Sequence, residues 1–189
     1  YYKEKKNELS EDPEQFMNGL CSTMNHAVCH YGKENKINSM GTTAAMLAFG
    51  KENVYSCNLG DSRIYQISSE GKLGQLSLDH VLGGGRFGKP PLTQYLGIPE
   101  ESMGLEPTIV PQKAEIGTRY LICSDGITDM LSDGEIADIL TREISVSETV
   151  ELLVERALIK GGRDNITVIL CELVEQEKSL FGKLLNYFL

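Results

Sequence analysis

Four aspartates lie in turns beside predicted strands, where their side chains could act together. Asp61 follows a glycine between two strands, and Asp125 precedes a glycine at the exit of an apolar strand. Asp129 comes four residues after Asp125, a spacing of one helical turn if the backbone coils there. Asp164 lies just before the last predicted strand. All four are therefore candidates for one shared site.

Carboxylates in such positions suit the binding of hard divalent cations. Mg²⁺ and Mn²⁺ prefer oxygen ligands, retain several waters, and are held by a few carboxylates. The structural alternative applies to each aspartate alone, because Asp before Gly or Asn is common turn chemistry. A single one of these residues is more often a turn former than a ligand.

The first half of the chain predicts one helix followed by short strands. Asp12 is a candidate N-cap before Pro13, and residues 13–31 carry apolar side chains at helical spacing. The predicted buried stripe comprises Phe16, Leu20, Thr23, Met24, Ala27, Val28 and Tyr31. Segments 44–49, 53–59, 63–68 and 72–76 are separated by turn residues and predict a meander of antiparallel strands.

The second half predicts a strand, two helices and a final strand. Residues 119–124 read as a short apolar strand. Two Ser-x-x-Glu capping boxes, beginning at Ser132 and Ser145, predict helices that run through Leu140 and over about 148–160. Residues 165–173 are apolar on both faces, which predicts a strand in the middle of a sheet. This pattern indicates an α+β protein with sheets covered by helices.

Length and composition limit the possible classes of protein. The 189 residues fit a single domain over 1–189, with a core at 13–173 and a tail at 174–189. A net charge of −9 argues against nucleic acid as a partner. The five scattered cysteines form no Cys-x-x-Cys pair, which argues against a zinc site and favours reduced thiols in the cytoplasm.

Some features have competing interpretations. His80 beside Asp79 could act as a general base, but we interpret it as structural. His26 and His30 are one helical turn apart, and we place them on a solvated face. The apolar tail segment 178–189 is too short to span a bilayer; we expect it to pack on protein rather than to lie on a membrane.

Five ordered sequence blocks resemble the signature blocks of type 2C protein serine/threonine phosphatases, in the bacterial style. The resemblance spans about residues 13–173. The blocks are Gly-Thr-Thr-Ala at 41–44, Asn-Leu-Gly-Asp-Ser-Arg at 58–63, Leu-Asp-His at 78–80, Ser-Asp-Gly-Ile-Thr-Asp at 124–129 and Arg-Asp-Asn-Ile-Thr-Val at 163–168.

The resemblance implies a fold, a metal centre and a reaction. The fold would be an antiparallel β-sandwich flanked by helices, and Asp125 and Asp164 would be ligands of a two-metal centre holding Mn²⁺ or Mg²⁺. Asp61 and Asp129 would be ligands of a weaker third metal, and Arg63 would buttress the Asp61 turn. The reaction would be hydrolysis of phosphoserine and phosphothreonine by a metal-activated water, on phosphoproteins of a cognate serine/threonine kinase.

The sequence departs from the family pattern in two places. The family's Asp-Gly-x-Gly block does not occur before the matched region, so we expect the fold to be N-terminally incomplete and the chain as given to be inactive. The region 81–91 is shorter than the flap of bacterial members. The alternative function is a noncatalytic phosphatase-like module that binds a partner or senses a ligand. Retention of all four aspartates argues against this alternative, and the missing block favours it.

Overall fold

The structure is a computed structural model that describes residues 8–50, 52–83, 89–99, 101–102 and 104–175. Its elements in chain order are α2 (Glu8–Glu11), α3 (Pro13–Glu34), β1 (Ala44–Phe49), β2 (Asn53–Leu59), β3 (Arg63–Ile67), β4 (Leu73–Gln75), β5 (Thr108–Lys113), β6 (Arg119–Cys123), α4 (Asp125–Thr128), α5 (Asp133–Leu140), α6 (Val146–Ile159) and β7 (Val168–Glu172).

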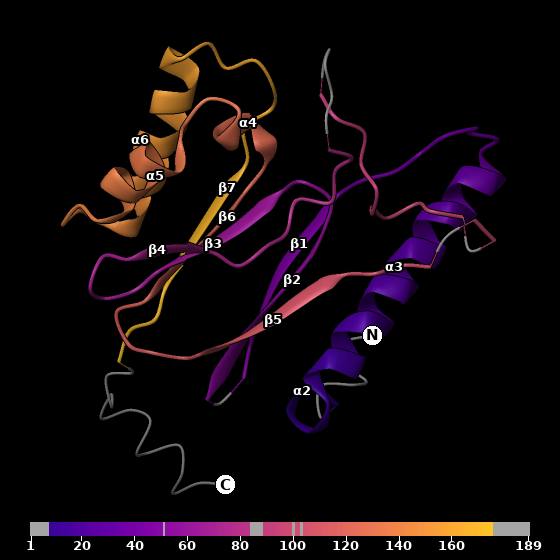
Figure 1. Ribbon diagram of the computed structural model, residues 1–189, viewed down its shortest axis with the longest axis horizontal. Helices are drawn as coiled ribbons and strands as arrows, with labels where there is room; N and C mark the ends of the chain where they lie inside the picture. Colours follow the sequence, from indigo (N-terminus) through magenta and orange to yellow (C-terminus); the bar gives the residue numbers. More distant parts are fainter. Residues whose placement is uncertain (1–7, 51, 84–88, 100, 103, 176–189) are drawn as a thin grey trace, which may run out of the picture.

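Two antiparallel sheets form the centre of the molecule (Figure 1). One sheet has the strand order β1-β2-β5, and the other has the order β4-β3-β6-β7. Helix α3 covers the outer face of the first sheet, and α5 and α6 cover the outer face of the second. The expectation of an α+β sandwich flanked by helices is confirmed.

Alternation along the strands distributes apolar side chains among three buried clusters. In β6, Tyr120 faces the other sheet whereas Leu121 faces α5 and α6. In β2, Val54 faces the other sheet whereas Cys57 and Leu59 face α3. Because successive strand residues point to opposite faces, both faces of each sheet are covered and the sandwich holds together as four layers.

The connection through Asp61 differs from the predicted meander. Strand β2 pairs with β1 and β5, whereas β3 pairs with β4 and β6. The turn at Asp61 therefore carries the chain from one sheet to the other and closes no hairpin. Alternating short strands predict pairing within a single sheet, but burial of both faces favours two stacked sheets.

Two strands in the second half also differ from expectation. Strand β5 was not predicted, because Pro111 interrupts its pattern; proline is tolerated there because β5 is an edge strand. Strand β7 was predicted in mid-sheet, but it lies at the edge of its sheet and Ile169 is 52% exposed. The apolar alternation of residues 165–173 does not by itself distinguish a central strand from an edge strand.

Helix α3 begins as predicted but buries a different face. The Asp12 carboxylate accepts a hydrogen bond from the backbone N–H of Gln15 at 2.9 Å, and Pro13 occupies the first turn. The buried side chains of α3 are Phe16, Met17, Cys21 and Asn25. Thr23, Ala27 and Tyr31 of the predicted stripe are exposed, whereas Leu20, Met24 and Val28 pack against the core. Asn25 is buried because it bonds the backbone of residues 97 and 98.

The later helices are defined by their caps. Both predicted capping boxes, Ser132 with Glu135 and Ser145 with Glu148, are present. Gly161 and Gly162 follow α6 with positive φ angles of 126° and 49°, which explains why the helix stops there. Residues 8–11 form one helical turn before α3, and its Leu9 is buried.

The cysteines, the helices and the C-terminal tail were the subjects of further expectations. All five cysteines are free thiols, and Cys21, Cys57 and Cys123 are buried. Within the described ranges, no helix combines the length and apolar character needed to cross a bilayer. The apolar segment 178–189 and part of the short flap region lie outside the described residues.

Candidate metal centre

Sheet pairing gathers the four predicted aspartates at one end of the second sheet. Strand β3 begins opposite the end of β6, with Arg63 paired to Cys123, and β7 begins opposite the same residue. Asp61 precedes β3, Asp125 follows β6, and Asp164 precedes β7. The antiparallel register therefore places the three turns at a common edge.

The turn that carries Asp125 is fastened to the segment after Asp164. The Ser124 hydroxyl donates to the backbone carbonyl of Asn165 at 3.1 Å and accepts from the N–H of Thr167 at 3.0 Å. A side-chain Cβ at Gly126 would lie 2.3 Å from the Asn165 carbonyl oxygen. Only glycine permits this approach, so the Asp-Gly pair places Asp125 next to Asp164.

Asp129 lies where its spacing predicted. Residues Asp125–Thr128 form the helical turn α4, and the Asp129 N–H donates to the carbonyl of Asp125 at 2.8 Å. The predicted helical turn is confirmed, and it places the carboxylates of Asp125 and Asp129 on the same side of the backbone.

One ammonium group lies among three of these aspartates. The Nζ of Lys89 forms an ion pair with Asp125 and is 3.4 Å from an oxygen of Asp129 and 3.4 Å from an oxygen of Asp164. Partial burial acts to lower the pKa of Lys89, but the charges of Asp129 and Asp164 outweigh it and the pKa is raised. The pKa of Asp164 is lowered, chiefly by the N–H of Asn165 and then by Lys89.

The donor set fits a divalent cation. The Lys89 ammonium occupies the place that such an ion would take, because it is a cation in contact with carboxylate oxygens of three aspartates. Two of its contacts are 3.4 Å, whereas Mg²⁺ binds oxygens at about 2.0–2.1 Å. Over the described part of the chain, no group of three or more His, Cys, Asp or Glu side chains is placed to hold a metal ion. The carboxylates therefore have the right chemistry and a common location, and they must draw together to bind a metal.

The turn that carries Asp61 is fixed by its neighbours. Gly60 has a φ of 101°, and a Cβ there would be 2.4 Å from the Thr43 methyl group, so glycine is required. The backbone N–H of Gly60 donates to the ring Nδ1 of His80 at 3.1 Å, and the backbone N–H of His80 donates to the Gly60 carbonyl. Asp61 lies at the same end of the sheet, outside the ion pairs of Lys89.

His80 acts as a structural link in this turn. Its Nδ1 accepts from Gly60, so its Nε2 carries the proton and donates to the Thr108 hydroxyl at 3.0 Å. The residue is buried, and burial lowers its pKa. Both ring nitrogens are engaged by the protein, which agrees with the structural interpretation of His80.

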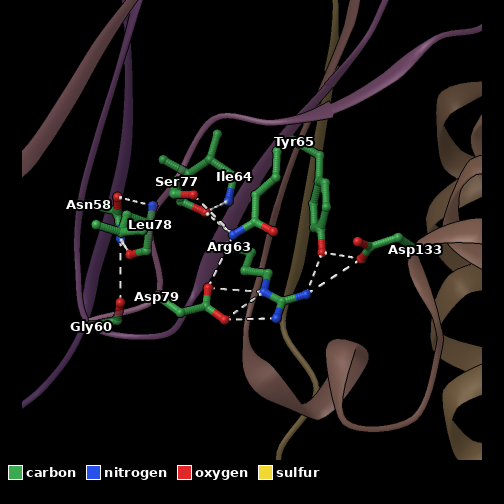
Figure 2. Close-up of polar contacts among 10 residues, drawn as sticks. Asn58, Gly60, Arg63, Ile64, Tyr65, Ser77, Leu78, Asp79 and Asp133 are labelled. Atoms are coloured by element: carbon green, nitrogen blue, oxygen red, sulfur yellow. Dashed lines mark hydrogen bonds and ion pairs between the residues drawn. The ribbon is translucent and has the colours of Figure 1, made fainter. Parts of the chain in front are cut away.

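Arg63 ties three segments together behind the turn (Figure 2). Its guanidinium donates to both carboxylate oxygens of Asp79, with the shortest contact at 2.7 Å. It also donates to the Tyr65 hydroxyl at 2.9 Å, and that hydroxyl donates to Asp133 at 2.7 Å. Asp79 precedes His80, and Asp133 begins α5, so Arg63 buttresses the Asp61 turn as predicted. The pKa of Arg63 is raised, mainly by Asp79.

The comparisons with known proteins agree with this geometry. The family model described as Protein phosphatase 2C matches residues 1–160. The chain belongs to the protein phosphatase 2C family. It is 32% identical to serine/threonine phosphatase stp of Listeria welshimeri, over 86% of this chain and 69% of that one.

Solved phosphatase 2C structures show the same fold. The serine/threonine phosphatase of S. agalactiae superposes with a TM-score of 0.76 at 28% identity, over 87% of this chain and 72% of that one. The catalytic domain of the phosphatase PstP, solved in complex with two manganese ions, superposes with a TM-score of 0.69 at 32% identity, over 80% of this chain and 67% of that one.

Sequence reasoning found the aspartates of this phosphatase 2C chain and missed Lys89. The lysine comes from a short loop with no periodic pattern, and it lies 36 residues before Asp125 in the chain. Its approach to the aspartates depends on tertiary structure, and no local signal in the sequence marks it.

Proposed function

We propose that the protein hydrolyses phosphoserine and phosphothreonine in phosphoproteins, with Mn²⁺ or Mg²⁺ as its metal. In this proposal Asp125 and Asp164 are ligands of a two-metal centre, and Asp61 and Asp129 are ligands of a weaker third metal. The observation that carries it is the convergence of Asp125, Asp129 and Asp164 on one cation, Lys89. The two manganese ions of the PstP domain support the choice of metal.

The chain's own residues supply position and charge. Ser124 and Gly126 hold Asp125 beside Asp164, and Arg63 and His80 hold the turn of Asp61. When bound, a pair of divalent ions lowers the pKa of water and neutralises phosphate charge. The carboxylates must therefore be fixed in place before the phosphoester arrives.

The cellular compartment and the source of the substrates follow from the same proposal. We propose that it acts in the bacterial cytoplasm on the products of a cognate serine/threonine kinase. The free cysteines support a reducing compartment, and the relative from Listeria welshimeri supports a bacterial setting. We also propose that residues 1–189 form one domain with its core at 13–173, since three buried clusters connect the four layers.

Replacing one central aspartate tests this function. In the full-length protein, Asp164→Asn should reduce Mn²⁺-dependent hydrolysis of a phosphothreonine peptide by at least about a hundredfold, because one ligand of the metal pair is lost. Its thermal midpoint in chelator should stay close to that of wild type or fall slightly, because the Asn side chain can still accept from the Asn165 N–H but loses its attraction to Lys89, and that exposed ion pair is weak. Turnover and the midpoint are measured for both wild type and variant.

Asp138→Asn is the matched control, because Asp138 is an exposed aspartate on α5, outside the cluster. Its turnover should equal that of the wild type. Near-normal turnover in Asp164→Asn, or loss of its fold, would return Asp164 to the role of a turn residue.

A further inference from the structure

Lys89 reaches the aspartate cluster from a segment that the backbone anchors beside it. Val81 and Leu92 form an isolated antiparallel bridge, and the N–H of Leu82 donates to the carbonyl of Pro91 at 3.0 Å. These contacts hold residues 91–92, which follow Lys89 closely in the chain, against residues 81–82. The backbone near Lys89 is therefore held in place, whereas its side chain remains free to change rotamer.

The ammonium uses the oxygens that a metal would need. Its three ion pairs go to the Oδ2 atoms of Asp125, Asp129 and Asp164. A divalent ion bound to the same carboxylates would lie within a few ångströms of the ammonium, where like charges repel strongly. Lys89 and a metal ion therefore exclude each other from the cluster.

We propose that Lys89 is an intramolecular counter-cation, which holds the aspartates together in the metal-free protein and must leave before a divalent ion binds. This inference rests on the proposed metal-dependent function. The departure is physically easy, because the Lys89 side chain is 43% exposed and its ion pairs lie at the surface. It can swing into solvent without opening the core.

Exchange of one cation for another makes metal affinity depend on Lys89. The apparent affinity for metal equals the intrinsic affinity multiplied by the fraction of molecules in which the ammonium has left the cluster. Removing the charge abolishes this competition, whereas a conservative cation keeps it. Lys89 thus sets the metal concentration at which the enzyme becomes loaded.

Calorimetric titration of the full-length protein with Mn²⁺ measures the effect. Lys89→Met should bind Mn²⁺ about fivefold more tightly than wild type, because the competing ion pair is lost. Lys89→Arg should remain close to wild type. Lys72→Met is the matched control: Lys72 is exposed in the turn between β3 and β4, so the variant loses the same charge away from the cluster.

Amine labelling supplies a readout that is independent of affinity. Wild-type protein is acetylated with an N-hydroxysuccinimide ester with and without Mn²⁺, and labelled peptides are quantified by mass spectrometry. Labelling of Lys89 should rise at least about threefold with Mn²⁺, because the freed amine leaves its carboxylates. Labelling of Lys72 should not change.

Both results are required. The counter-cation role is wrong if wild type and Lys89→Met bind Mn²⁺ with equal affinity, or if Mn²⁺ does not change the labelling of Lys89. The phosphatase proposal stands in either case. If no variant binds Mn²⁺ and Asp164→Asn keeps its activity, the proposed metal centre and the inference fail together.

Discussion

At the scale of single residues, the candidate site depends on neighbours that have no chemistry of their own. Gly60 and Gly126 are required by close contacts with Thr43 and Asn165, and each positions the aspartate that precedes or follows it. Ser124 adds two hydrogen bonds at the same edge. The glycines and the serine are therefore as necessary to the site as the carboxylates.

His80 makes the fold of this edge sensitive to acid. Burial lowers the pKa of His80 in the folded protein below the value that it has in the unfolded chain. As the pH falls, the unfolded chain therefore binds this proton before the folded protein does, and unfolding becomes more favourable. The contribution of neutral His80 to stability is full above about pH 6.5 and is lost as the pH falls through its folded pKa. Between pH 7.5 and 5.5, the thermal midpoint should fall further in wild type than in His80→Gln.

The control is His30→Gln, because His30 is exposed on α3. This variant should keep the acid sensitivity of the wild type. An equal fall in His80→Gln and wild type would show that His80 has no such role.

Asp129 and Asp61 are predicted to act through a single weaker metal ion. In the full-length protein, Asp129→Ala and Asp61→Ala should each lower turnover several-fold and leave tight Mn²⁺ binding by the central pair intact. The third site has fewer protein ligands and retains more water, so it binds its ion more weakly than the central pair does. The double variant should lose little more than either single variant. Calorimetry and peptide turnover test this, and strictly additive losses would contradict a shared ion.

At the scale of elements, the two tyrosines of neighbouring strands illustrate opposite environments. The Tyr65 hydroxyl accepts from Arg63 and donates to Asp133, linking β3 to α5. The Tyr120 hydroxyl lies between the sheets, buried and without a hydrogen-bond partner in the described parts of the chain. Burial of an unpaired hydroxyl is costly, and its removal relieves that cost.

Tyr120→Phe should therefore raise the free energy of unfolding by about 1 kcal/mol. Tyr65→Phe should lower it by about 1–2 kcal/mol, because Arg63 and Asp133 lose a shared partner. Urea unfolding of both variants provides the measurement. A destabilised Tyr120→Phe, matching Tyr65→Phe, would mean that the Tyr120 hydroxyl is paired in solution.

Elements with local signals could be predicted from the sequence, and long-range arrangements could not. The capping boxes at Ser132 and Ser145 and the helix start at Pro13 depend on residues a few positions apart, and all are present. The transfer of the chain between sheets at Asp61 and the edge position of β7 depend on which faces become buried together. The face of α3 was mispredicted in part because Asn25 is buried by bonds to residues far along the chain.

At the scale of the whole molecule, the candidate metal site lies at one end of the sheets, which the four layers do not cover. The starts of β3 and β7 and the end of β6 meet there, and their turns carry Asp61, Asp164 and Asp125. The sequence could predict these aspartates because their turns are distinctive, whereas their metal-binding role stays a prediction. Their convergence on Lys89 is a property of the assembled sandwich.

The most direct test of the metal centre is anomalous diffraction from crystals of the full-length protein grown with Mn²⁺. We expect manganese peaks at this edge of the sheet, about 2.1 Å from carboxylate oxygens of Asp125 and Asp164, with the Lys89 ammonium displaced. Manganese peaks absent from this edge, with Lys89 still seated among the three aspartates, would contradict it.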